Sequence, residues 1–316
     1  MSCSNGSASG ANDLGLVRGA LIALGLLLLG ATVARAADYP LSDLAAIGPA
    51  DRILIVSPHP DDESLCCAGV IERALAAGAQ VDIVWLTSGD AFELDARWVE
   101  RTLRPGQAGL RKLGLRRMRE ARTAATRLGV PARDQFFLGF PDRGLLPLIV
   151  DHLYVPYTSP YTGLAAVRYP GTVDRGASYE GETLQDELAA LLDRIDPTYV
   201  LAPSPLDTHP DHRAAGSLVI RTMGRRHRLD RVRYWIVHAG RHWPAPRGLH
   251  ASAPLLAPPR ATGMAWERVP LDAAQQRAKL DALSAYGTQM IGLERRFLLA
   301  FVRENELFAR SALPVK

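Results

Sequence analysis

The sequence predicts an α/β protein with a Rossmann-like, mostly parallel sheet, helices on both faces, and a single domain that carries loop insertions. Three observations support this prediction. Short apolar runs alternate with segments of helical periodicity, His- and Asp-rich segments follow two of these runs, and no internal repeat breaks the alternation. Alternating strands and helices favour a parallel sheet, whose ligands bind beyond the carboxyl ends of the strands.

The first 36 residues are typical of a secretory leader, because an apolar run from Gly19 to Val33 follows Arg18 and ends in Ala-Arg-Ala at 34–36. The run is shorter than the ~20 residues of a membrane-spanning helix. We expect cleavage after Ala36 and export to the periplasm or the extracellular space. The alternative is an uncleaved signal anchor, which would be the protein's only attachment to a membrane. The predicted divisions are a leader over 1–36, a linker over 37–51, the domain over 52–308 and a tail over 309–316.

Apolar, largely β-branched runs predict buried strands, and apolar residues at helical spacing predict helices that end at glycines such as Gly78 and Gly129. The expected strands cover 52–56, 81–87, 135–138, 198–202 and 232–237. The expected helices cover 64–77, 117–128, 183–195, 213–224, 271–286 and 293–303. Residues 91–115 are expected to be irregular, and a Tyr-rich segment (143–182) and a Pro-rich segment (239–270) to form ordered loops.

Composition argues against a nucleic-acid partner. The net charge is +4, but only three of the 37 basic residues are lysines, and no basic stripe is interleaved with aromatic residues. Cys3 lies in the leader, which leaves the adjacent Cys66 and Cys67. Adjacent helical residues point about 100° apart, so we expect two buried thiols rather than a disulfide, and no cysteine-based zinc site.

The segment Ser-Pro-His-Pro-Asp-Asp-Glu at residues 57–63 is the clearest functional signal. It lies between the first apolar run and a helical pattern, so it forms a strand-to-helix turn. Its prolines force Ser57 and His59 away from helical backbone angles. Asp61 or Asp62 can cap the following helix. The turn therefore holds an imidazole and two carboxylates in a stiff loop.

A second segment, Asp-Thr-His-Pro-Asp-His at residues 207–212, follows another predicted strand. Because both segments end strands of one sheet, we expect them to meet at the same edge. A catalytic zinc site needs three protein ligands with nitrogen or oxygen donors and an open position for water. His59, one aspartate of the first segment and one histidine of the second supply such a set.

The remaining side chains have roles in the same chemistry. The aspartate of the Asp61-Asp62 pair that does not bind the metal would be a general base beside the metal-bound water. His209 and His212 are three residues apart, so both can face the site. One would bind the metal; the other, if protonated, could stabilise an oxyanion or protonate the leaving amine. Asp207 or Asp211 could keep that second imidazole charged.

Both segments resemble the motifs of the metal-dependent N-deacetylases of the LmbE/PIG-L superfamily, which remove acetyl groups from N-acetylglucosamine-containing and related amides. The resemblance extends over residues 52–308. It implies that zinc, or else iron(II) or another divalent ion, is bound by His59, Asp62 and His212. It also implies three catalytic residues: Asp61 as the general base, His209 as a charged imidazole that stabilises the transition state, and Asp211 as the orienting partner of His209.

Three more segments resemble parts of this family. Residues 117–120 are similar to its Arg-x-x-Glu helix, which implies that Arg117 binds substrate hydroxyls. Residues 139–142, Gly-Phe-Pro-Asp, are similar to another of its loops, which implies that Asp142 contacts the sugar. Residues 286–289, Tyr-Gly-Thr-Gln, are similar as well. In some relatives a tyrosine shortly before the second motif assists catalysis, whereas here Asp207 stands nearest.

The expected substrate is an N-acetylated sugar in a GlcNAc-type glycan or glycoconjugate. Export favours an envelope or extracellular glycan, and the sequence leaves open whether it is a polymer and whether the protein forms oligomers. Two alternatives remain. His59, Asp61 and His212 could form the facial triad of an iron(II) oxygenase, although such enzymes normally have all-β barrels. The second alternative is a non-catalytic glycan-binding module on the same fold, although such a module would be expected to have lost part of the ligand set.

Overall fold

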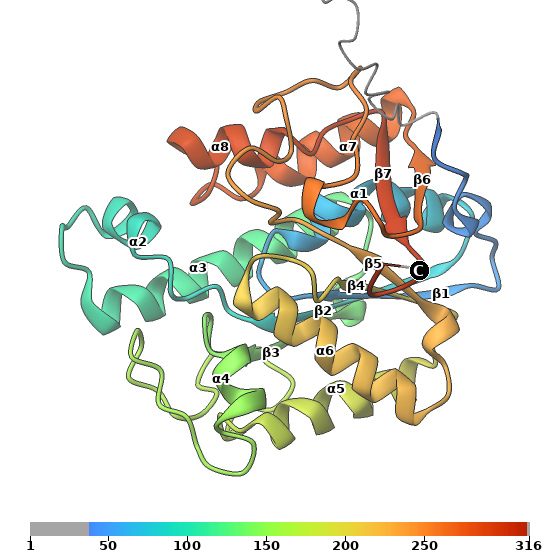
Figure 1. Ribbon diagram of the computed structural model, residues 1–316. Coiled ribbons are helices and arrows are strands. Elements are labelled where there is room, and N and C mark those ends of the chain that lie inside the picture. The colour runs from blue at the N-terminus through green and yellow to red at the C-terminus, as the bar shows by residue number, and fades with distance from the viewer. Residues whose placement is uncertain (1–37, 315–316) are drawn as a thin grey trace, which may run out of the picture. The chain divides into compact units, whose positions relative to one another are not determined.

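Seven strands form one sheet in the order β3-β2-β1-β4-β5-β7-β6 (Figure 1). The computed structural model describes residues 38–314. Strands β1 to β5 are parallel, whereas β7 runs antiparallel to both of its neighbours. This mixed, mostly parallel sheet confirms the predicted α/β fold. The strands are β1 Arg52–Ser57, β2 Gln80–Thr87, β3 Gln135–Phe140, β4 Tyr199–Pro203, β5 Val232–Trp235, β6 Trp266–Pro270 and β7 Asn305–Ala309.

Helices cover both faces of the sheet. Helix α7 packs against α1 and α3 on one face, and α4, α5 and α6 pack together on the other (Figure 1). Between these layers the side chains of β1, β2 and β4 are almost entirely buried. The helices are α1 Asp62–Ala76, α2 Glu93–Glu100, α3 Gly106–Arg127, α4 Leu145–Val150, α5 Gly181–Ile195, α6 Pro210–Arg225, α7 Ala273–Ser284 and α8 Gly292–Leu299.

The strand order changes direction between β1 and β4. From β1 the chain moves outward through β2 to β3, and from β4 it moves the other way to β5. In open parallel sheets, the loops on the two sides of such a switch point separate and leave a crevice at the carboxyl ends. The two His- and Asp-rich segments follow β1 and β4, so the topology places both at this crevice.

Several local predictions were wrong. Residues 91–115 contain α2 and the start of α3, the Tyr-rich insertion contains α4, and β6 and β7 were missed. Strand β7 has buried polar residues and β6 carries charges and a proline, so neither has the apolar run that we used to find strands. Their pairing with each other, from Trp266 opposite Ala309 to Pro270 opposite Asn305, supplies the missing stabilisation. The predicted linker also packs on this edge, where Leu44 is fully buried.

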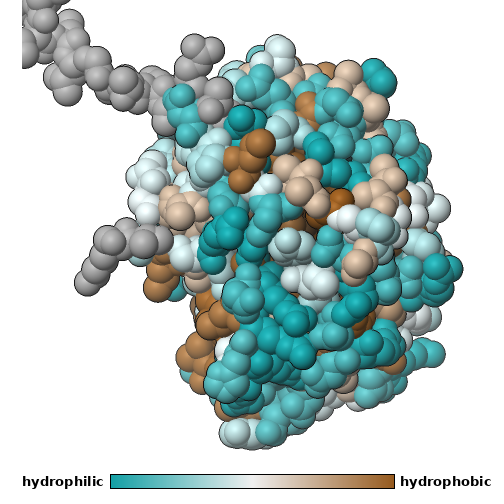
Figure 2. Space-filling model, turned by 90° about the vertical axis from the view of Figure 1, so that its right-hand side faces the viewer, coloured by the Kyte–Doolittle hydropathy of each residue, from teal (hydrophilic) through white to brown (hydrophobic). Residues whose placement is uncertain are grey.

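The cysteine prediction was also wrong, since Cys66 and Cys67 form a disulfide within α1. Their Cα atoms are 3.7 Å apart, and the two side chains turn toward each other from adjacent positions of the helix. The predicted leader lies outside the described residues. Within 38–314, no helix is long and apolar enough to cross a membrane. Figure 2 shows the side that faces right in Figure 1, where hydrophilic residues predominate.

Candidate metal-dependent active site

The turn after β1 has a conformation that the paired prolines only partly explain. Ser57 Oγ donates a hydrogen bond to the carbonyl oxygen of His59 over 2.7 Å, and the amide of His59 donates to Asp62 Oδ2 over 2.9 Å. Asp61 has φ 130°, a backbone conformation that residues other than glycine rarely adopt. Neither aspartate caps α1 through its side chain, contrary to our expectation. Both carboxylates are therefore available to the site.

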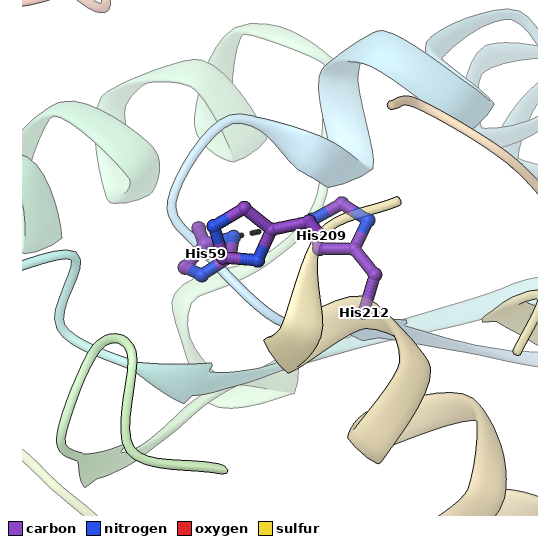
Figure 3. Close-up of side chains that lie close together, drawn as sticks. All are labelled: His59, His209 and His212. Atoms are coloured by element: carbon purple, nitrogen blue, oxygen red, sulfur yellow. Dashed lines mark hydrogen bonds between the residues drawn. The ribbon is translucent and has the colours of Figure 1, made fainter. Parts of the chain in front are cut away.

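The loop after β4 is built on Asp207, which is almost fully buried. Its Oδ1 accepts from the amide of His209 over 2.8 Å, and its Oδ2 accepts from the amides of Val237 and His238 over 2.9 Å each. His209 is the N-cap residue of α6, and Pro210 occupies the first turn, where its missing N–H costs nothing. His212 lies three positions later in the first turn of α6, and its Nε2 is directed toward His59 (Figure 3).

Three side-chain atoms from the two loops converge. His59 Nδ1 lies 3.2 Å from Asp62 Oδ2 and 3.2 Å from His212 Nε2, and the last two atoms are 3.1 Å apart. Ligands at zinc's usual bond length of 2.0–2.1 Å in tetrahedral geometry lie roughly 3.3 Å from one another. The three atoms are thus spaced like three ligands on one face of the tetrahedron around a small divalent cation.

The outer nitrogens of both imidazoles face carboxylates. His59 Nε2 lies 3.2 Å from Asp211 Oδ2 and 3.4 Å from Asp142 Oδ1, and His212 Nδ1 lies 3.1 Å from Asp207 Oδ2. With a metal bound, each outer nitrogen would donate its proton to a carboxylate, and the lone pair of each inner nitrogen would then point at the shared centre. Metal-binding histidines are oriented in this way in proteins. The donor set therefore fits a divalent metal such as zinc.

Asp211 differs from the role that we predicted. Its carboxylate contacts His59 and accepts from the amides of Arg143 and Leu145 over 2.6 and 3.1 Å, and does not accept from His209. Its backbone amide instead donates to His209 Nδ1 over 3.2 Å. Asp211 thus orients the predicted metal ligand rather than the predicted transition-state residue. Its participation in catalysis stays a prediction.

His209 lies edge-on against His59, with ring centroids 4.7 Å apart (Figure 3). Burial, together with the positive charges of His59 and His212, lowers the pKa of His209 to about 2. The environment thus favours a neutral ring, where the family resemblance implied a charged one. Because Nδ1 accepts a hydrogen bond from the amide of Asp211, the proton of the neutral ring is on Nε2.

Asp61 is 7 % exposed and faces the same space. Burial and the adjacent charge of Asp62 raise the pKa of Asp61 to about 8. Gln289 Nε2 donates to its Oδ2, and Arg117 Nη2 lies 3.6 Å from that oxygen. A raised pKa on a carboxylate beside a metal site is typical of general acid–base residues.

Arg117 and Asp142 are buried and line the same cavity as Asp61 and His209. Arg117 donates from Nη1 to the carbonyl oxygen of Gly89 and from Nη2 to that of Pro60, over 3.0 Å each. It therefore ties the loops after β1 and β2 together, a function that the sequence did not reveal. With His59, Asp61, Asp142 and His209 it lines a cavity of about 570 Å³. Binding of a sugar by Arg117 or Asp142 stays a prediction.

Residues of the C-terminal third complete the site. His238 was missed in the sequence, and Tyr286 was noted only as part of a segment that is similar to the family. Glu63 is fully buried, and it accepts hydrogen bonds from Trp85 Nε1 over 2.8 Å, from the Tyr286 hydroxyl and from the amide of Asp61 over 3.2 Å. The His238 ring centroid lies 4.8 Å from that of His212, and His238, Asp62 and His212 together offer ligand atoms that lie close enough to share a metal ion. The position of His238 at the end of β5 is the signal that could have indicated it.

Residues 54–223 match the sequence profile of the PIG-L family, described as GlcNAc-PI de-N-acetylase. This is more than half of the chain. The chain belongs to the PIG-L family. A 1D-myo-inositol 2-acetamido-2-deoxy-alpha-D-glucopyranoside deacetylase of Actinosynnema mirum is 34% identical over 164 residues, 51% of this chain and 50% of that protein. The diacetylchitobiose deacetylase of Thermococcus kodakarensis is 27% identical over 54% of this chain and 48% of its own.

This PIG-L family member thus spans about half the length of the curated relatives that it matches. Among solved structures, a pseudoaglycone deacetylase has a TM-score of 0.53 at 20% identity, over 82% of this chain and 96% of its own. An N,N'-diacetylchitobiose deacetylase from Pyrococcus horikoshii has a TM-score of 0.50 at 18% identity, over 82% of each chain. These structures share the α/β fold, which differs from the all-β barrel that an oxygenase triad would favour.

Proposed function

We propose that this protein is a zinc-dependent hydrolase that removes the acetyl group from an N-acetylated sugar. The observation that carries the proposal is the triangle of His59 Nδ1, Asp62 Oδ2 and His212 Nε2, whose sides measure 3.1–3.2 Å, beside a cavity that His59 lines. Family membership and the names of the relatives support the N-acetyl sugar as substrate. A complete ligand set also argues against a binding module that has lost its catalytic residues.

His59, Asp62 and His212 would hold the ion. When bound, zinc lowers the pKa of a water molecule and polarises a carbonyl oxygen. Asp61 accepts the proton of the attacking water and delivers it to the sugar nitrogen as the C–N bond breaks, which yields acetate and a free amine. A cation beside Asp61 would lower its raised pKa toward neutrality, where a general base is effective.

His209 and Arg117 complete the mechanism. The proton on His209 Nε2 can be donated to the carbonyl oxygen as negative charge develops there, and a neutral donor suffices for this task. Gln289 and Arg117 hold the Asp61 carboxylate through Oδ2. Asp207 and Asp211 keep His212 and His59 in the tautomers that leave their inner nitrogens unprotonated.

Acetate release by the purified zinc-loaded protein tests the proposal, with N-acetylglucosamine, its short oligomers and GlcNAc glycoconjugates as substrates. Asp61→Asn should retain zinc and lose about 10² to 10⁴ in rate, as is usual when a general base is removed. Asp186→Asn, an exposed change on α5, is the control and should be fully active. The proposal is wrong if zinc-loaded protein releases no acetate from any of these substrates, or if Asp61→Asn matches the control.

A further inference from the structure

The outer part of the cavity is formed by a different portion of the chain from its floor. Arg247, Arg296 and Phe297 line it together with Glu294 and Leu293, and all five lie beyond residue 223, where the family match ends. Arg143, from the loop after β3, lines it as well. We call Arg143, Arg247 and Arg296 the arginine mouth.

The arginine mouth has an excess of positive charge. No carboxylate of residues 38–314 forms an ion pair within 4.0 Å with any of its three guanidinium groups. Glu294 is the one acidic residue of α8 that lines the cavity. Burial raises the pKa of Glu294 and the charge of Arg247 opposes that rise, so this carboxylate offsets one of the three positive charges of the arginine mouth. An anion entering the cavity would therefore meet a net attractive field.

Arg247 has an unused hydrogen-bond donor. Its Nη2 donates to the carbonyl oxygen of Arg241 over 3.1 Å, whereas its Nη1 is buried and has no partner within the described part of the chain. The guanidinium carbon lies 4.5 Å from the centre of the Phe297 ring, which fixes the plane of the group. Nη1 is closed to solvent in this conformation, so a ligand atom would contact it only after the guanidinium turns toward the cavity. Such a contact would recover the free energy that an unpaired charged donor costs.

A stack of rings connects Arg247 to the metal-binding residues. Phe297 lies parallel to His238, with ring centroids 5.5 Å apart and planes at 16°, and His238 contacts the His212 ring at 4.8 Å. Arg247, Phe297 and His238 therefore form one wall that leads from the cavity floor to its mouth. The volume of about 570 Å³ lies within the range of sites for drug-sized ligands, about 300–1,000 Å³, which leaves space beyond one sugar ring.

We propose that the substrate carries an anionic group, a carboxylate or a phosphate, on the part that extends outward from the N-acetyl sugar, and that the arginine mouth binds it. This inference rests on the proposed deacetylase activity for the location of the sugar. A planar guanidinium with a free donor suits either oxyanion, because both offer two oxygens to one fork.

Matched substrates test this inference. The first is a neutral GlcNAc disaccharide, the second is the disaccharide in which the neighbouring sugar is glucuronic acid, and the third is GlcNAc 1-phosphate. The acidic substrates should show about tenfold or higher kcat/KM than the neutral one, mainly through lower KM, since a hydrogen bond to a charged group typically contributes that much. Comparison of kcat/KM for the second and third substrates distinguishes a preference for a carboxylate from a preference for a phosphate.

Arg247→Gln and Arg296→Gln should remove most of this preference, so that kcat/KM for the acidic substrates falls toward the value of the same variant for the neutral disaccharide. Arg295→Gln is the matched control, because Arg295 is an exposed neighbour on α8 that does not line the cavity. Equal kcat/KM for neutral and acidic substrates, or a preference that survives in Arg247→Gln, would overturn the inference while the deacetylase proposal stands.

Binding separates the two proposals further. Calorimetric titration of zinc-loaded Asp61→Asn with the same three sugars requires no turnover. Tighter binding of the acidic sugars, lost in the Asp61→Asn/Arg247→Gln double variant, would support the arginine mouth even if no acetate is released from any sugar. Equal affinities for all three sugars would refute it on binding alone.

Discussion

Replacement of Gly89 by alanine should disrupt the site through Arg117. Gly89 has φ +66°, and a Cβ at this position would lie 2.5 Å from Arg117 Nη1 and 2.7 Å from Cζ. The guanidinium is buried and held by the carbonyl oxygens of Gly89 and Pro60, so it cannot move aside without losing both hydrogen bonds. Each is worth about 1.5–3 kcal/mol, because the donor is charged.

Gly106→Ala is the matched control. Gly106 has φ +59°, close to that of Gly89, but a Cβ there would have no atom within 4 Å. In both variants the left-handed backbone conformation of the alanine costs about 1–2 kcal/mol of folding free energy. The free energy of unfolding of Gly89→Ala should therefore fall by roughly 3 kcal/mol more than that of Gly106→Ala.

Equilibrium urea denaturation of the two variants measures this difference, and acetate release measures its effect on the site. We expect kcat/KM to fall at least tenfold in Gly89→Ala and to stay near the parent value in Gly106→Ala, because only the first displaces a group 3.6 Å from Asp61. The reasoning is refuted if the two variants lose the same stability, since the steric contact with Arg117 would then be without consequence.

Three further predictions concern the metal and the buried charges. Asp207→Asn should weaken zinc binding about 10- to 100-fold, as measured by competition with a chromogenic chelator, because the asparagine no longer fixes the His212 tautomer; unchanged affinity would contradict this role. Chelation of the metal should abolish acetate release, and zinc should restore it, whereas activity that persists in metal-free protein would exclude the proposed mechanism. Burial, aided by the charge of Asp134, raises the pKa of Asp82 from 3.8 to about 6. Ionisation of Asp82 therefore lowers the free energy of unfolding by its full amount above about pH 6 and has no effect below about pH 3.8. Asp82→Asn should therefore raise the free energy of unfolding by about 2 kcal/mol at pH 8 and by little at pH 3.5, and an equal gain at both pH values would argue against this cause.

The sequence predicted the sheet and the two loops because their signals are local. A β-branched run shows a buried strand within a few residues, and the alternation of strands and helices is sufficient to place the ends of β1 and β4 at the same edge of the sheet. His59, Asp62 and His212 are brought together by this topology alone. The same reasoning located Asp61 and His209 at the site.

The contacts that orient these side chains could not be predicted, because they join distant residues. Gln289 reaches Asp61 across 228 positions, and Tyr286 reaches Glu63 across 223. The partner of Asp211 depends on which side chain stands nearest after folding, and this is His59 rather than His209. The arginine mouth was missed for the same reason, since Arg247 and Arg296 lie in segments without a local motif.

The hydrogen bonds from Tyr286 and Gln289 to the loop after β1 also limit which substitutions such a protein can accept during evolution. The segment that identifies the family ends at residue 223, yet Asp61, the proposed general base within it, accepts a hydrogen bond from Gln289 in the last tenth of the chain. Helix α1 depends on the same region, where Glu306 accepts from the amides of Gly69 and Val70. A recombinant that exchanged the residues beyond 223 with those of a relative would keep all three proposed metal ligands and still lose the contact that positions Asp61. Substitutions at 61 and 289, and at 63 and 286, should therefore be inherited as pairs.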